Sequence, residues 1–182
     1  MRSDFSLETR RLILRPYRME DVPDAHAIFS DPVVMACCEA PYTLKQTEEQ
    51  VAFFRRSGIA LAARHRQQGR MISHLLFKQM PGEAQGIYEI GWIFHRGCWR
   101  QGYAYEAANA LIEHGFAELH LHKICAETIS PVSVHLMRKL GMEIEGVFRQ
   151  HAKNPQGQWA DVTWAGMLNP LHHNQTTGGT YE

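Results

Sequence analysis

The stretch from His95 to Ala104 has the residue types of a phosphate-binding turn. It carries two arginines and has Gly102 near its end. Apolar and aromatic residues alternate along 88–94 as in a strand, and apolar residues recur at helix spacing along 104–115. The first N–H groups of a helix lack partners inside it and point into the preceding turn, where the helix dipole adds positive potential. The sequence therefore predicts a cradle for a phosphate or pyrophosphate.

The turn alone leaves an alternative open, because an ordinary strand–turn–helix connection with glycines has the same pattern. Two other phosphate motifs are missing from the sequence. No G-x-x-x-x-G-K-[ST] is present, which excludes a P-loop nucleotide site, and no G-x-G-x-x-G follows a strand, which argues against a Rossmann dinucleotide site.

The segment EIGWIFHRGCWRQGYAYEA, residues 89–107, resembles the acetyl-CoA motif of the GNAT acetyltransferases, [RQ]-x-x-G-x-[GA]. Gly102 and Ala104 match its last two positions, and Trp99 replaces Arg or Gln, as is common in the Rim-like ribosomal-protein N-terminal acetyltransferase branch. TxRLxLRP at 9–16 and SxxLMxKLGM at 133–142 also resemble that branch. The resemblance covers about residues 8–168. It implies an acetyl-CoA-dependent N-acetyltransferase that acts on a primary amine by direct attack in a ternary complex.

The resemblance also implies which residues hold acetyl-CoA. The pyrophosphate would lie on the turn, and the pantetheine arm would lie beside the end of the strand and the start of a later helix. The family's Asn at that helix start is replaced by Ser130, which removes an amide. The expected cofactor-binding residues are Ile93, Phe94, His95, Arg100, Gln101, Gly102, Tyr103, Ala104, Ser130 and Ser133.

Three residues are candidates for the acid–base chemistry. Glu89 could take a proton from the amine, although a solvated strand carboxylate is an equal alternative. Ser133 stands where the Rim-like branch has a serine that meets the departing thiolate, although a hydroxyl at a helix start often bonds to backbone. His151 follows the strand that contains Arg149, and an imidazole titrates in the useful range. Met137 replaces the tyrosine that many GNAT enzymes use.

One domain must position these residues. The resemblance implies an α+β fold with three α/β/α layers, whose mixed, mostly antiparallel sheet has six to seven strands and about four flanking helices. A helix crosses over between strands 88–94 and 123–128, which makes these two central strands parallel. In the family they splay apart, and we expect a bulge at Gly91 to help. The folded domain is expected over 1–168, followed by a flexible tail over 169–182. The remaining elements are expected as strands at 11–15, 58–66, 70–78, 142–150 and 158–168, and as helices at 20–29, after Thr43, and from 131.

Composition and charge argue against nucleic-acid, membrane and metal partners. The 182 residues have a formal net charge of zero, so no nucleic-acid surface is indicated. The four cysteines include an adjacent pair and no C-x-x-C, which indicates reduced thiols in a cytoplasmic protein. No apolar run suits a membrane span, and the close histidine pairs lack a metal-ligand set. The acceptor is a protein N-terminus or a small-molecule amine, the chain is a monomer or homodimer, and a CoA-binding interaction module without catalysis remains the alternative.

Overall fold

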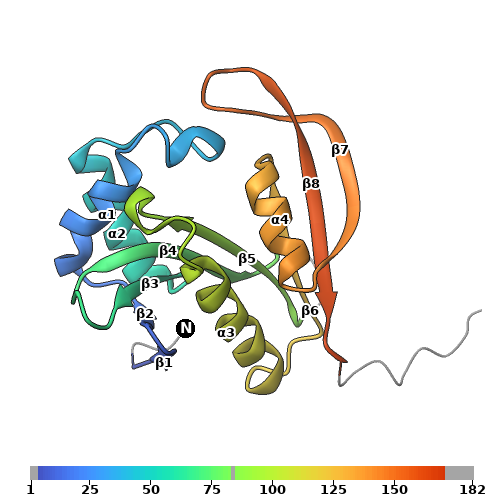
Figure 1. The fold of residues 1–182 in the computed structure, drawn as a ribbon, viewed down its shortest axis with the longest axis horizontal. Helices are drawn as coiled ribbons and strands as arrows, with labels where there is room; N and C mark the ends of the chain where they lie inside the picture. The colour runs from blue at the N-terminus through green and yellow to red at the C-terminus, as the bar shows by residue number, and fades with distance from the viewer. Residues whose placement is uncertain (1–3, 83–84, 171–182) are drawn as a thin grey trace, which may run out of the picture.

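The computed structural model describes residues 4–82 and 85–170. It contains one eight-stranded mixed sheet in the order β1-β2-β3-β4-β5-β6-β8-β7 (Figure 1). The strands are β1 (Leu7–Glu8), β2 (Leu12–Pro16), β3 (Ala60–His65), β4 (Met71–Gln79), β5 (Ile87–Phe94), β6 (Lys123–Thr128), β7 (Glu143–Lys153) and β8 (Trp159–Leu168). The α-helices are α1 (Val22–Phe29), α2 (Leu44–Ser57), α3 (Tyr103–Ala117) and α4 (Pro131–Lys139). Short 3-10 turns are η1 (Met19–Asp21), η2 (Met35–Cys37) and η3 (Arg96–Cys98). The predicted fold class is confirmed, with the two-residue β1 as an additional edge strand.

The two central strands separate as expected. β5 and β6 pair in parallel only from Ile87 opposite Lys123 to Glu89 opposite Cys125, after which both strands continue without each other. They lie together near the bottom of Figure 1 and diverge toward its top. The bulge expected at Gly91 is wrong, because the β4–β5 register runs without a shift along the whole of β5. A Cβ at position 91 would lie 3.3 Å from Cβ of Leu76, so the glycine permits close packing against β4.

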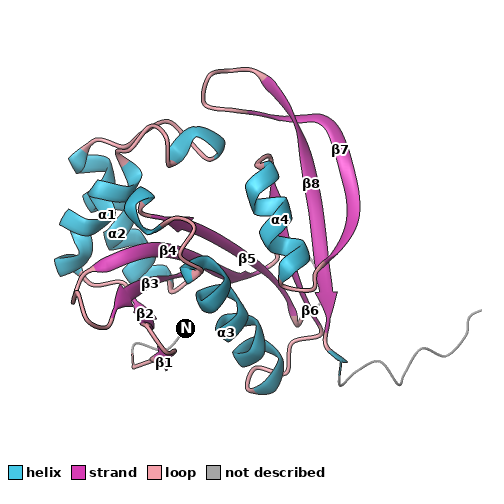
Figure 2. Ribbon diagram, in the orientation of Figure 1, coloured by secondary structure: helices cyan, strands magenta, loops and turns pink. Residues whose placement is uncertain are grey.

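Helices cover both faces of the sheet and create two cores (Figure 2). The larger core lies under α3 and α4 and includes Ile90 and Phe94 of β5. The smaller core lies under α1 and α2 and includes Ile93, which points to the opposite face of the same strand. Among the described residues, none from β6, β7 or β8 belongs to the smaller core. α1 and α2 therefore pack over the β3 and β4 side of the sheet and not over these three strands (Figure 1).

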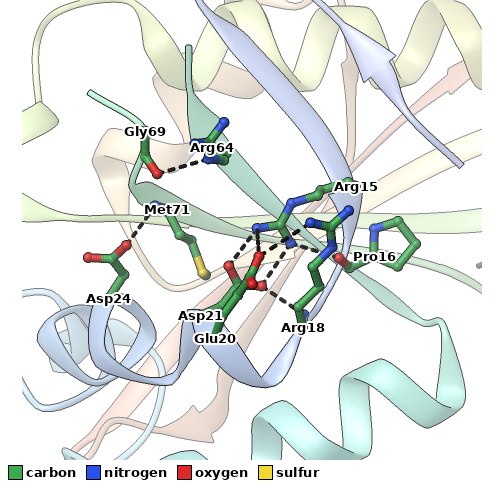
Figure 3. Close-up of polar contacts among 9 residues, drawn as sticks. All are labelled: Arg15, Pro16, Arg18, Glu20, Asp21, Asp24, Arg64, Gly69 and Met71. Atoms are coloured by element: carbon green, nitrogen blue, oxygen red, sulfur yellow. Dashed lines mark hydrogen bonds and ion pairs between the residues drawn. The ribbon is translucent and has the colours of Figure 1, made fainter. Parts of the chain in front are cut away.

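A buried ion pair fixes the start of α1 against β2 (Figure 3). The carboxylate of Asp21 accepts hydrogen bonds from Nη1 and Nη2 of Arg15 at 2.8 and 2.6 Å, and from the backbone N–H of Arg18 at 2.8 Å. The Arg15 and Asp21 side chains are only 9% and 4% exposed. One helical turn later, Asp24 accepts the backbone N–H of Met71 at 2.8 Å, which ties α1 to β4.

The folded part extends past β8. Asn169 is buried, and its side-chain amide donates to the carbonyl of Leu121 at 2.8 Å. The predicted tail over 169–182 begins too early, because Asn169 belongs to the packed domain, and residues 171–182 lie outside the described residues. No helix within 4–82 and 85–170 is both long and apolar enough to cross a membrane.

Candidate active site

The predicted cradle forms where β5 passes through η3 into α3. Arg100 and Gly102 have φ angles of 60° and 80°, and these left-handed residues turn the chain sharply before the helix. Gly102 is the N-cap of α3, and no side chain within 4–82 and 85–170 caps the first N–H groups of the helix. These donors and the helix dipole together suit an anion.

An ion pair between the β1–β2 turn and α3 holds the cradle in place. Nε of Arg11 donates to Glu106 of α3 at 2.6 Å, and Nη1 of Arg11 donates to the carbonyl of Gln101 at 2.9 Å. Glu106 also accepts the backbone N–H of Arg11 at 2.7 Å and the hydroxyl of Thr9 at 2.6 Å. Burial alone would raise the pKa of Glu106, but the hydrogen bonds from Thr9 and Arg11 outweigh it and lower the pKa.

Several predicted cofactor residues stabilise the turn through their side chains. Nδ1 of His95 accepts the N–H of Gly97 at 3.1 Å, and the Gln101 amide donates to the carbonyl of Gly97 at 2.8 Å. The indole N–H of Trp99 donates to the carbonyl of Phe94 at 2.9 Å. These bonds fix the backbone on which the N–H groups are presented.

The Tyr103 side chain points into the protein. It is 7% exposed, its hydroxyl lies 2.9 Å from Nε2 of His65, and the Arg11 guanidinium lies 4.1 Å above its ring. Only its backbone can face an anion in the cradle. Phe94 is also buried, and Ala104 packs against the same core.

A cavity of about 560 Å³ lies beside the cradle. Lys139 of α4 reaches it and lies 5.0 Å from the ring of Tyr105. Its lining residues are Glu8, Thr9, Arg10, Arg11, Gly102, Tyr105, Glu106, Asn109, Ala110, Glu113 and Lys139.

The start of α4 presents two serines. Ser130 occupies the N-cap position without a side-chain capping bond, and its N–H donates to Oγ1 of Thr128 at 3.0 Å. Ser133 lies in the first turn and is partly exposed. Met137, which stands in the place of the family's tyrosine, is 1% exposed and packs in the larger core.

Glu89 lies on the α1/α2 face of β5, directly opposite Lys78 of β4. Their charged groups are 3.2 Å apart, and the Glu89 side chain is 17% exposed. Glu89 is therefore an ion-paired carboxylate on the sheet face that also carries Ile93.

His151 lies on a bulge in β7. Phe148 pairs with Val162 and Ala152 pairs with Ala160, so the residues between oppose Asp161 alone. Gln150 has a φ of 49°, and its N–H donates to the Asp161 carboxylate at 2.8 Å. Such bulges redirect side chains and are frequent beside active sites. His151 is exposed there, and its ring centroid lies 5.3 Å from that of Phe148.

The structure adds Glu127, which the sequence analysis did not select. It follows Cys125 by two residues on β6, so it shares the face of Glu89 beyond the point where the strands separate. Its side chain is exposed to solvent, yet partial burial and then the charge of Glu89 raise its pKa, while His151 and Lys78 oppose that increase. We call Lys78, Glu89, Glu127 and His151 the charged row.

Comparisons with known proteins agree with this geometry. Residues 11–143 match the family model described as an acetyltransferase (GNAT) domain. The chain belongs to the GNAT acetyltransferase family. It is 31% identical over 166 residues to the uncharacterized N-acetyltransferase YnaD of Bacillus subtilis (strain 168), covering 87% of this chain and 95% of YnaD. A GNAT-family acetyltransferase structure from Bacillus anthracis is 28% identical, with a TM-score of 0.82 over 91% of this chain and 99% of that one.

Two more distant GNAT structures contain coenzyme A. One is RimL, a ribosomal L7/L12 α-N-protein acetyltransferase, with 17% identity and a TM-score of 0.77 over 90% of this chain and 98% of that one. The other is a Vibrio cholerae spermidine N-acetyltransferase bound to CoA and spermine, with 21% identity and a TM-score of 0.76 over 88% and 97% of the two chains. This GNAT enzyme is an N-acetyltransferase with acetyl-CoA as its co-substrate and an amine as its acceptor.

Proposed function

We propose that this GNAT enzyme acetylates a primary amine, on a protein N-terminus or a small molecule, by direct attack on acetyl-CoA in a ternary complex. One observation carries the proposal. β5 and β6 separate between the cradle at the start of α3 and the charged row on the α1/α2 face. A thioester held in the gap can be reached by an amine from the charged row.

The residues present fit acetyl-CoA. The uncapped N–H groups at the start of α3 suit its pyrophosphate, and the cavity beside Gly102 and Lys139 offers room for its nucleotide end. Among the residues that the structure describes, the edge of β5 that faces β6 has no strand partner from Ile90 to Phe94, so its backbone groups can bond to the amides of the pantetheine arm. We expect Ile93, His95, Arg100 and Ala104 to contact the pantetheine arm or the pyrophosphate at its end.

The side chains at the start of α4 suit the leaving group. As the amine nitrogen attacks the thioester carbonyl, the C–S bond breaks and a thiolate departs. We expect Ser133 to donate a hydrogen bond to that thiolate and Ser130 to contact the arm. Glu89, held by Lys78, supplies negative charge that attracts the cationic acceptor. His151 is accessible on the opposite side of the acceptor space.

Two further observations concern the compartment and the assembly. All four cysteines are free thiols, which supports the cytoplasm as the compartment. The open edge strand β7 permits a homodimer as well as a monomer.

Thermal unfolding with acetyl-CoA, CoA, ATP and NAD tests the cofactor. A ligand at a hundred times its Kd should add about 2.7 kcal/mol of stability, so acetyl-CoA and CoA should raise Tm while ATP and NAD should not. Thiol release from acetyl-CoA is then measured across peptide N-termini and small amines. A Tm shift without turnover on any amine would favour the noncatalytic CoA-binding module, and no shift with either CoA compound would overturn the proposal.

A further inference from the structure

We infer that Glu127 is the general base of this enzyme, the group that takes the proton from the acceptor ammonium. The inference rests on the proposed function and assigns a role within that site. It gives the family reaction a base that neither the acetyl-CoA motif nor the resemblance selects.

The position of Glu127 suits this role. It lies beyond the last β5–β6 pair, where the gap between the strands is open, and on the face that α1 and α2 leave uncovered over β6. Its cross-strand neighbour on β8 is Trp164, whose ring centroid lies 6.4 Å from that of Phe148. An amine entering beside these rings meets the Glu127 carboxylate at the edge of the gap.

The other two candidates are less suitable. Lys78 occupies the Glu89 carboxylate at 3.2 Å, and an opposite charge at this distance makes a carboxylate a weaker proton acceptor. His151 is exposed on the β7 bulge and lies at the outer end of the charged row. Glu127 is the carboxylate of the row that makes no ion pair among the described residues.

The surroundings of Glu127 set its proton affinity. Partial burial of the side chain and then Glu89 from β5 raise its pKa, and His151 from β7 and Lys78 from β4 lower it. Cys125, on the same strand, stays a neutral thiol because burial, followed by Glu89, raises its pKa to about 11. Lys123 and Glu145 pair with each other at 2.7 Å and so nearly cancel.

The proton transfer balances without a further reactant. The Glu127 carboxylate takes one proton from the ammonium, and the neutral amine then forms the C–N bond as the C–S bond breaks. The thiolate receives a proton to give free CoA, and Glu127 returns its proton to solvent, which reaches it directly.

Glu127→Gln tests the inference against the exposed carboxylate control Glu143→Gln on β7. Both variants are assayed with the best acceptor of the amine panel from pH 6 to pH 10, after acetyl-CoA binding has been verified by thermal shift. Glu127→Gln should lower kcat by about 10²-fold or more near neutral pH, since general bases contribute 10²–10⁴. KM for acetyl-CoA should not change. The deficit should shrink as pH rises, because the amine then arrives already neutral, and Glu143→Gln should match wild type throughout.

A purely structural role for Glu127 would give a deficit that is the same at every pH, and that result would overturn the inference. Wild-type kcat in Glu127→Gln would overturn it as well, while leaving the N-acetyltransferase activity intact. If wild-type protein binds acetyl-CoA but acetylates no amine, the proposed function fails first and the inference fails with it.

Discussion

Replacing Glu106 by Gln should weaken both the fold and the cradle. The carboxylate accepts three hydrogen bonds of 2.6–2.7 Å, two from Arg11 and one from Thr9. The amide of Gln keeps one oxygen for Thr9 and the Arg11 backbone, but it places an NH₂ against Nε of Arg11. A hydrogen bond to a charged group contributes about 1.5–3 kcal/mol, and a neutral one about 0.5–1.5 kcal/mol. Since the Arg11 and Glu106 side chains are 34% and 16% exposed, solvent screening places the expected loss near the lower end, about 2 kcal/mol.

Urea denaturation at pH 7 measures this loss, and Tm should fall by about 4–8 °C in a domain of this size. The pKa of Glu106 is lowered in the folded state, so its contribution is complete above the unfolded pKa and disappears as pH falls through the folded pKa. The difference between Glu106→Gln and wild type should therefore close in acid. Acetyl-CoA binding should also weaken, because Arg11 supports the Gln101 carbonyl of the cradle.

The matched control is Glu113→Gln on the same helix, where an exposed carboxylate accepts from the amide of Asn109 at 2.8 Å. It should change stability by less than about 0.5 kcal/mol. If Glu106→Gln were equally silent, the argument that this ion pair anchors the cradle would be refuted.

Three further predictions address the cradle, the buried Arg15–Asp21 ion pair and the buried His74. Gly102→Ala and Gly157→Ala both replace a glycine of positive φ, 80° and 78°, so each should lower the free energy of unfolding in urea by about 1–2 kcal/mol. Only Gly102→Ala should raise the Kd for acetyl-CoA. An equal effect of both variants on this Kd would contradict a site at the cradle. Asp21→Ala leaves the buried Arg15 charge unpaired and should lower the free energy of unfolding by about 3–5 kcal/mol. The control Glu20→Ala should change it little, because the Glu20 side chain is 67% exposed. A loss below about 1 kcal/mol for Asp21→Ala would show that solvent reaches Arg15. Burial lowers the pKa of His74 to about 4, so the unfolded chain binds that proton more readily than the folded one. The free energy of unfolding of the wild type should therefore fall by up to about 3 kcal/mol as pH drops from about 6.5 toward 4. Urea titrations at several pH values should show a weaker pH dependence for His74→Gln, and an unchanged pH dependence would assign the effect to other groups.

Local patterns in the sequence predicted most of the fold. The helix expected after Thr43 forms as α2, and Thr43 and Gln46 make a capping box with bonds of 3.3 and 2.8 Å in the two directions. Gly102 takes the left-handed conformation on which the cradle depends. Periodicity, caps and turn residues act over a few positions, so one chain is enough to read them.

The missed features depend on contacts between distant segments. Arg11 and Glu106 are 95 positions apart, and nothing in either local stretch indicates the pair. Glu127 can be recognised as a candidate site residue only from the β5–β6 register, which shows that it lies on the same face as Glu89. The β7 bulge is visible only once the pairing of β7 with β8 is known. The wrong prediction of a bulge at Gly91 shows the same limit, because a glycine in a strand can mark close packing as well as a bulge.

The alternation of β5 explains how one strand can serve two substrates. Ile90 and Phe94 point into the core under α3 and α4, which fixes the strand where it enters the cradle. Glu89 and Ile93 point to the opposite face, where the acceptor is proposed to bind. Among the described residues, the backbone from Ile90 to Phe94 has no strand partner on the β6 side, where the pantetheine arm is proposed to bind. Core packing, the proposed acceptor site and the proposed pantetheine site thus lie on three different sides of β5. A substitution at Glu89 should therefore change acceptor preference without disturbing the backbone edge proposed for acetyl-CoA.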